Sequence, residues 1–220
     1  MIKACVFDMD GTVLDTITTI TYFVNVTLKK FGIPEISEDE CKIFVGNGAR
    51  ILIERIFKSR GIEDSALLEE VLNSYNAAYD ENPTHLTAPF SEIPELLSKL
   101  KARGIKVGIV SNKPDFITRP LAERFFGELV DLTFGGRDGI PLKPAPDAVF
   151  SVLDTFSAKP SECVYVGDTG VDMQTGKNLG ARLTVGVLWG FRSEKELREN
   201  GADVIVDTPL KIFDEVLKLD

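Results

Sequence analysis

Short apolar runs alternate with helical patterns along most of the chain. The runs are rich in β-branched residues and end at glycine, aspartate or proline, which is typical of buried parallel strands. They lie near residues 2–7, 104–110, 129–134, 163–166, 183–187 and 204–206. Between them, apolar residues recur at helical spacing at 94–103, 116–126, 146–156 and 171–179. This alternation predicts an α/β fold with an open parallel sheet flanked by helices.

One connection is far longer than the others. Roughly 90 residues separate the first strand from the strand near residue 105, whereas connections between such strands are usually much shorter. Residues 16–86 carry only helical patterns, including an apolar stripe formed by Ile17, Ile20, Val24, Leu28 and Phe31. They predict an all-helical domain inserted into a core made of residues 1–15 and 87–220. A core that merely has extra helices fits the same pattern.

The composition narrows the classes of partner. Of the 220 residues, 44% are hydrophobic and 27% are charged, as in an ordinary globular protein, and the formal net charge is -9. An acidic surface repels nucleic-acid phosphates and anionic lipids. The sequence contains neither an apolar run long enough to span a bilayer nor a signal-peptide pattern. We therefore expect a cytoplasmic protein, a monomer or homodimer, with no nucleic-acid or membrane partner.

The rarer reactive residues exclude several kinds of chemistry. Cys5, Cys41 and Cys163 lack metal-binding spacing and fit small buried side chains. The single histidine, His85, has no Cys-x-x-Cys, His-x-x-x-His or G-x-S-x-G companion, which favours a boundary residue over a ligand or base. The sequence has no G-x-x-x-x-G-K-[ST] loop, so an NTP-driven enzyme of that type is not expected.

Two carboxylates follow the first predicted strand. Asp8 and Asp10 are two positions apart, and alternate residues of a strand point to the same side. Like charges that share one small volume repel each other unless a cation or a proton relieves them. Taken alone, the pattern fits an ordinary Asp-Gly turn equally well.

Polar residues also follow three other predicted strands, namely Ser111, Asn112 and Lys113, then Lys143, then Asp168 and Asp172. Ligands of open α/β sheets bind outside the carboxyl ends of the strands. Each residue alone has a structural alternative, such as a helix cap for Ser111 and Asp168 or a solvated charge for Lys143. Together they predict one site, in which carboxylate oxygens suit Mg²⁺ while Lys143 and Ser111 hold an anion.

A carboxylate that attacks a phosphate group needs these neighbours. At about 4 Å and an effective dielectric near 20, each pair of like unit charges costs about 4 kcal/mol. One divalent cation and one lysine supply enough positive charge to reverse the sign of the interaction. The set therefore indicates phosphoryl transfer to a carboxylate nucleophile.

Four short motifs resemble those of the haloacid dehalogenase-like superfamily. They are Asp8-Met9-Asp10-Gly11-Thr12, Val110-Ser111-Asn112-Lys113, Lys143-Pro144 and Gly167-Asp168-x-x-x-Asp172. The resemblance covers essentially the whole chain. It implies a Rossmann-like core with an inserted helical cap of the first subclass, and Mg²⁺ as cofactor.

The same resemblance implies a role for each site residue. Asp8 is the nucleophile that forms an aspartyl phosphate, and Asp10 is the general acid and base. Mg²⁺ binds to Asp8, Asp168 and the main-chain carbonyl of Asp10, while Asp172 supports the metal's waters or Lys143. The phosphoryl group is bound by Ser111, Asn112 and Lys143. The superfamily's carbon–halogen hydrolases lack an aspartate at the position of Asp10, so dehalogenation is not expected.

Within the superfamily the chain is similar to phosphoglycolate phosphatases. The supporting segments are Val45-Gly46-Asn47-Gly48, Lys143-Pro144-Ala145-Pro146, Leu188-Trp189-Gly190-Phe191 and Gly201-Ala202-Asp203. This similarity implies hydrolysis of a small phosphorylated metabolite. A phosphomutase of β-phosphoglucomutase type and an inorganic pyrophosphatase are the alternatives. A non-catalytic binding module is disfavoured because the matching positions are intact.

The inserted domain should select the substrate. Gly46, Asn47 and Gly48 precede a helical pattern, so main-chain N–H groups there are able to face an anion. Arg50 is then suited to a substrate carboxylate. A turn with a solvated arginine is an equally simple interpretation.

Overall fold

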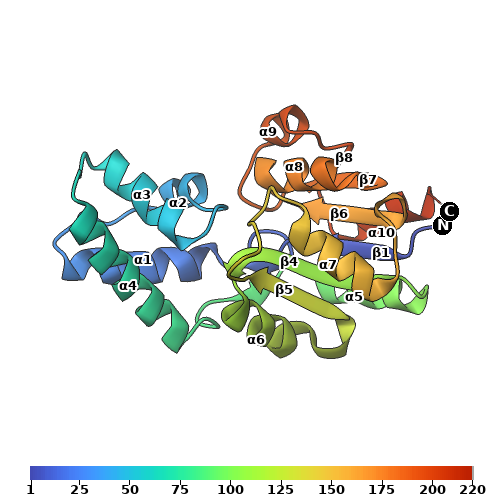
Figure 1. Cartoon of the computed structure of the whole chain (residues 1–220), viewed down its shortest axis with the longest axis horizontal. Helices are drawn as coiled ribbons and strands as arrows, with labels where there is room; N and C mark the ends of the chain where they lie inside the picture. The colour runs from blue at the N-terminus through green and yellow to red at the C-terminus, as the bar shows by residue number, and fades with distance from the viewer. Residues whose placement is uncertain (220) are drawn as a thin grey trace. The chain divides into compact units, whose positions relative to one another are not determined.

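The computed structural model describes residues 1–219, which form two compact units (Figure 1). One unit contains Met1–Asp15 and the chain from Pro89 onward, and the other contains Thr16–Ala88. Within the described residues, no helix combines the length and apolar character needed to cross a membrane.

The first unit is built on a parallel six-stranded sheet in the order β5-β4-β1-β6-β7-β8. Its strands are β1 (Ala4–Phe7), β4 (Lys106–Pro114), β5 (Leu132–Gly136), β6 (Cys163–Gly167), β7 (Leu183–Val187) and β8 (Val204–Val206). A separate two-stranded pair joins β2 (Leu14–Asp15) to β3 (Ala88–Pro89). The predicted α/β fold with an open parallel sheet is confirmed.

Helices flank this sheet, and the first four of them lie where the sequence pattern predicts helices, whereas the last two were not predicted (Figure 1). They are α5 (Ile93–Ala102), α6 (Asp115–Phe126), α7 (Asp147–Phe156), α8 (Gly170–Leu179), α9 (Glu194–Glu199) and α10 (Leu210–Leu217), with 3-10 turns at Gly127–Leu129 and Pro160–Glu162. Ala4 and Val6 of β1 share a buried cluster with Val149 and Val152 of α7. The alternate residues Cys5 and Phe7 point to the opposite face and are also fully buried. Both faces of the central strand are therefore covered, which explains its uninterrupted apolar sequence.

Strand β4 is longer than its apolar pattern predicts. The pattern ends at Val110, whereas β4 continues to Pro114. The register with β5 shifts between Val110 and Pro114, and pairing resumes at Gly136. A side chain at Gly135 would lie 2.5 Å from the Cα atom of Asp115. Glycine at the end of β5 thus allows the polar part of β4 to stay in the sheet.

The helices of the second unit are α1 (Ile17–Lys30), α2 (Glu38–Phe44), α3 (Ala49–Ser59) and α4 (Ser65–Glu81). In the predicted stripe of α1, Ile17, Ile20, Val24 and Leu28 are all buried. Ser37 and Glu40 form a capping box at the start of α2, and Asp64 caps α4. The single histidine, His85, is half-buried. The centroid of its ring lies 4.6 Å from that of Tyr22.

Candidate active site

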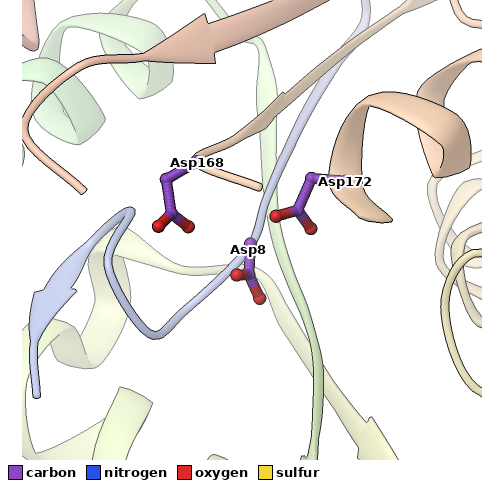
Figure 2. A group of neighbouring side chains, drawn as sticks. All are labelled: Asp8, Asp168 and Asp172. Atoms are coloured by element: carbon purple, nitrogen blue, oxygen red, sulfur yellow. The ribbon is translucent and has the colours of Figure 1, made fainter. Parts of the chain in front are cut away.

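The first strand places Asp8 at the carboxyl edge of the sheet. Asp8 follows β1 directly, and its main-chain N–H donates to the carbonyl of Val166 in β6 at 2.9 Å. Its side chain is buried, and lies close to those of Asp168, at the end of β6, and Asp172, in α8 (Figure 2). Three separate elements therefore bring one carboxylate each to a single small volume.

Lys143 is the cation of this cluster. Its ammonium group donates to Asp8 Oδ1 at 2.6 Å and to Asp172 Oδ1 at 2.7 Å, and its side chain is 3% exposed. Burial alone would lower the pKa of Lys143, but Asp172 and Asp8 outweigh it and raise that pKa well above its usual range. Lys143 is therefore a buried cation that bridges two carboxylates and not the solvated surface residue of the alternative interpretation.

Asp172 serves the site from the first turn of α8. Its Oδ2 accepts from the N–H and hydroxyl of Thr169, and its Oδ1 accepts from Lys143 and from Tyr165. These four contacts use roughly the full acceptor capacity of a carboxylate. Thr169 is the N-cap residue of α8, so the alternative that Asp168 caps this helix is wrong.

Asp168 is held from both sides. Its Oδ1 accepts from the hydroxyl of Thr12 at 3.0 Å, and its Oδ2 accepts from the main-chain N–H of Phe191 at 2.8 Å. Asp168 is fully buried, yet these two contacts leave lone pairs on both oxygens. Its carboxylate thus keeps acceptor sites that Asp172 has already filled.

The cluster carries excess negative charge. Burial and the charge of Asp172 raise the pKa of Asp8 to about 7, even though Lys143 opposes the shift. Burial, Asp172 and Asp8 also raise the pKa of Asp168 well above its ordinary value. Carboxylate oxygens of the three aspartates lie within 4.8 Å of one another. When all three groups are ionised, three carboxylates against one ammonium leave two charges to neutralise, which a divalent cation with oxygen ligands matches.

The polar residues of β4 divide into three roles. Ser111 is buried, and its hydroxyl oxygen accepts from the N–H of Lys113 at 3.2 Å, so it lies within the strand and is not a helix cap. The side-chain amide of Asn112 donates to the carbonyl of Lys143 and accepts from its main-chain N–H. Lys113 donates to Asp10 Oδ1 at 2.8 Å.

The sequence places Lys113 among the polar residues at the strand ends but does not predict its ion pair with Asp10. Lys113 and Ser111 are two positions apart in β4, and the period of a strand would have placed them on one face. The contacts that Thr12 and Phe191 make to Asp168 are not predicted either. The hydroxyl of Thr12 lies within the first motif, but a main-chain N–H such as that of Phe191 leaves no signal in a sequence.

The helical unit holds the remaining predicted residues. Gly46 and Gly48 have positive φ angles of 111° and 86°, and α3 begins directly after Gly48. Asn47 Oδ1 accepts from Arg55 at 2.8 Å. Arg50 forms a two-pronged ion pair with Glu69 at 2.6 and 2.8 Å. Arg50 is therefore an exposed side chain whose charge is paired within its own unit.

Comparison with known proteins places this site in a family. The model of the family described as haloacid dehalogenase-like hydrolase matches residues 5–186. The chain belongs to this family. The predicted resemblance is thus confirmed, and the motifs that carry it lie within the matched range.

Several relatives of the chain are phosphatases. It is 32% identical over 190 residues to a phosphoglycolate phosphatase from Aquifex aeolicus, with 86% of each chain covered. It is 30% identical over 216 residues to an N-acetylmuramic acid 6-phosphate phosphatase from Pseudomonas aeruginosa, covering 97% of this chain and 94% of the relative. A crystal structure of a candidate phosphoglycolate phosphatase from Lactobacillus delbrueckii subsp. bulgaricus has a TM-score of 0.91 and 31% identity, with 97% and 98% coverage. These relatives confirm the predicted enzyme class, a phosphatase.

Proposed function

We propose that the chain is a Mg²⁺-dependent phosphatase that hydrolyses a small acidic phosphomonoester through an aspartyl phosphate on Asp8. The observation that carries the proposal is the Asp8–Lys143 contact within a buried cluster of three carboxyl groups and one ammonium group. Such a cluster is stable as a set of carboxylates when a divalent cation is bound, and its lysine lowers the repulsion between Asp8 and a phosphate dianion.

Asp8 and Asp10 carry out the bond changes in this proposal. A carboxylate oxygen of Asp8 bonds to phosphorus while the bond from phosphorus to the substrate alcohol breaks, and Asp10 gives its proton to the leaving oxygen. A water then attacks phosphorus, Asp10 takes a proton from that water, and the bond between phosphorus and Asp8 breaks. Inorganic phosphate leaves, and both aspartates return to their starting states.

The neighbouring residues orient the phosphoryl group. Ser111 and Lys143 bind its oxygens, with Asn112 holding the main chain of Lys143. Asp8 and Asp168 are the side chains that retain acceptor sites for Mg²⁺, alongside the main-chain carbonyl of Asp10, while Asp172 serves Lys143. When bound, the metal supplies positive charge next to the phosphoryl oxygens.

Phosphoglycolate is the proposed substrate class, and the helical unit is the proposed cap domain that selects it. The support is the set of phosphoglycolate phosphatases among the relatives, which cover most of this chain. N-acetylmuramic acid 6-phosphate is the second candidate because a relative named for it is 30% identical over 97% of the chain. Both molecules join a phosphate ester to a carboxylate. Gly46, Asn47, Gly48 and Arg50 are proposed as the specificity residues of the cap.

The test is phosphate release from a panel of compounds in the presence of Mg²⁺. The panel contains phosphoglycolate, N-acetylmuramic acid 6-phosphate, pyrophosphate and a hexose 1-phosphate. We expect the highest kcat/KM for phosphoglycolate and loss of activity with a chelator. Conversion of the hexose 1-phosphate to its 6-phosphate, without release of phosphate, would instead identify a phosphomutase.

The nucleophile is tested with Asp8→Asn. We expect kcat to fall by at least about 10³-fold, since covalent catalysis is lost and only binding and charge stabilisation remain. Asp154→Asn, an exposed aspartate of α7, is the matched control and should leave kcat unchanged. Substantial turnover by Asp8→Asn would refute the aspartyl phosphate.

A further inference from the structure

Trp189 contacts one of the two residues that donate hydrogen bonds to Asp168 and lies two residues before the other. The indole Nε1 of Trp189 donates to the main-chain carbonyl of Thr12 at 3.0 Å. The hydroxyl of the same Thr12 donates to Asp168 Oδ1, and the N–H of Phe191, two residues beyond Trp189, donates to Asp168 Oδ2. Both hydrogen bonds that hold the Asp168 carboxylate therefore come from residues linked to Trp189.

The main chain around Trp189 approaches Asp168 very closely. A Cβ atom added at Gly190 would lie 2.3 Å from Asp168 Cβ and 2.5 Å from the carbonyl oxygen of Gly11. A Cβ atom added at Gly11 would lie 2.4 Å from Asp168 Oδ2, and Gly11 has a φ angle of +86°. Two glycines thus let two segments of main chain approach one carboxylate closely.

From this geometry we propose that Trp189 is a positioning residue that sets the orientation of Asp168 and thereby the Mg²⁺ affinity of the site. The proposal rests on the proposed function, because it takes Asp168 as a metal ligand. The indole fixes the carbonyl of Thr12, and so fixes the loop that carries the Thr12 hydroxyl. Residues outside the ligand set that orient a ligand typically change metal affinity by about 10- to 100-fold when they are replaced.

The fluorescence of Trp189 itself can report on this role. Trp189 is the single tryptophan of the sequence, and its ring lies 6.4 Å from that of Phe90 between centroids. Since the indole is two hydrogen bonds away from Asp168, binding of Mg²⁺ should change the tryptophan emission of the whole protein. The Mg²⁺ concentration at half-change should equal the dissociation constant measured by calorimetry.

The experiment titrates Mg²⁺ alone, by calorimetry, into the full chain and three variants. Trp189→Phe removes the indole N–H and should weaken Mg²⁺ binding about 10-fold or more. Thr12→Val removes the hydroxyl at the other end of the same chain of contacts and should weaken binding similarly. Phe90→Leu removes the ring beside Trp189 but keeps the indole N–H, so its Mg²⁺ affinity should match that of the original protein. Circular dichroism establishes that each variant is folded.

The outcomes separate this proposal from the proposed function. If the original protein and Trp189→Phe bind Mg²⁺ equally well, the positioning role is refuted while a metal-dependent phosphatase stands. If Phe90→Leu loses as much affinity as Trp189→Phe, packing and not the hydrogen bond is responsible, and the proposal is again refuted. If the original protein itself does not bind Mg²⁺, the metal dependence in the proposed function fails, and this inference fails with it.

Discussion

Asn112 holds the main chain of Lys143 with both ends of its side-chain amide. Its Oδ1 accepts from the N–H of Lys143 at 2.8 Å, and its Nδ2 donates to the carbonyl of Lys143 at 3.2 Å. The residue that bridges Asp8 and Asp172 is therefore fixed from β4, a strand far from it in the sequence. The sequence motifs predict the same asparagine only as a phosphate ligand, and that contact stays a prediction.

Asn112→Ala should lower kcat by about 10- to 100-fold, because a shift of the lysine by about 1 Å is enough to cost that much in rate. Thermal unfolding should show that the free energy of unfolding falls by about 1–3 kcal/mol, because two hydrogen bonds are lost. Steady-state kinetics and a melting curve measure both. The control is Asn178→Ala, which removes one exposed contact to the carbonyl of the next residue, Pro144, and should change kcat little. An Asn112→Ala enzyme with normal kcat would contradict the positioning of Lys143.

Replacing Lys113 should impair the general acid and base. Lys113 contacts Asp10 Oδ1 at 2.8 Å, and its side chain is only 10% exposed. In Lys113→Met we expect kcat to fall about 10-fold or more. General acid–base catalysis typically accelerates a reaction by about 10² to 10⁴-fold, and a misplaced Asp10 would lose part of that acceleration. Lys113→Arg should recover part of the rate, and Lys99→Met, at an exposed ion pair of α5, should be normal. Equal rates for Lys113→Met and the original protein would exclude this role.

The excess charge of the cluster predicts opposite effects of Asp168→Asn with and without metal. Without Mg²⁺, removing one of three crowded carboxylates should leave the melting temperature unchanged or raise it, because the cost of burying that charge and its repulsion with Asp172 and Asp8 are relieved. With Mg²⁺ at about 100 times its dissociation constant, the original protein should gain about 2.7 kcal/mol while the variant gains much less. Differential scanning calorimetry with chelator or Mg²⁺ measures both. The same gain in both proteins would mean that Asp168 does not bind the metal.

The carboxylate of Asp131, which lies outside the site, should make the free energy of unfolding depend on pH. Burial raises its pKa, but the N–H of Val107 and the ammonium groups of Lys106 and Lys101 outweigh burial, so the folded-state pKa lies below the ordinary value. A depressed pKa means that the ionised carboxylate stabilises the fold above about pH 3.9 and that this stabilisation is lost as the pH falls through the lower, folded-state value.

Asp131→Asn should therefore lower the free energy of unfolding by about 1–3 kcal/mol at neutral pH, and by progressively less below about pH 4. Urea unfolding at a series of pH values measures the difference. The control is Asp154→Asn, because Asp154 is exposed and does not make the contacts described for Asp131. A difference between Asp131→Asn and the original protein that does not change with pH would show that the carboxylate's charge is not the stabilising feature.

The sequence by itself determined the class of fold and predicted most of the polar groups that meet at the site. Apolar runs such as Ala4–Phe7 must be buried on both faces, and their alternation with helical stripes leaves a parallel sheet as the economical arrangement. Polar residues at the carboxyl ends of such strands then meet at one edge of the sheet. Asp8, Lys143 and Asp168 are therefore predicted to share a site from the sequence alone, since side-chain chemistry and strand period are both local properties.

Only the tertiary structure decided which partner each of these groups takes. The extension of β4 to Pro114 depends on a register shift against β5, which no local period records. Asn112 contacts the main chain of Lys143, and Asp168 accepts from the main-chain N–H of Phe191. Arg50 pairs with Glu69, which lies on another helix. Main-chain groups have no letter in a sequence, and an ion pair depends on distances that only packing sets. The sequence thus determines which groups the site contains, while the fold determines which of their lone pairs and protons remain free for a substrate or a metal.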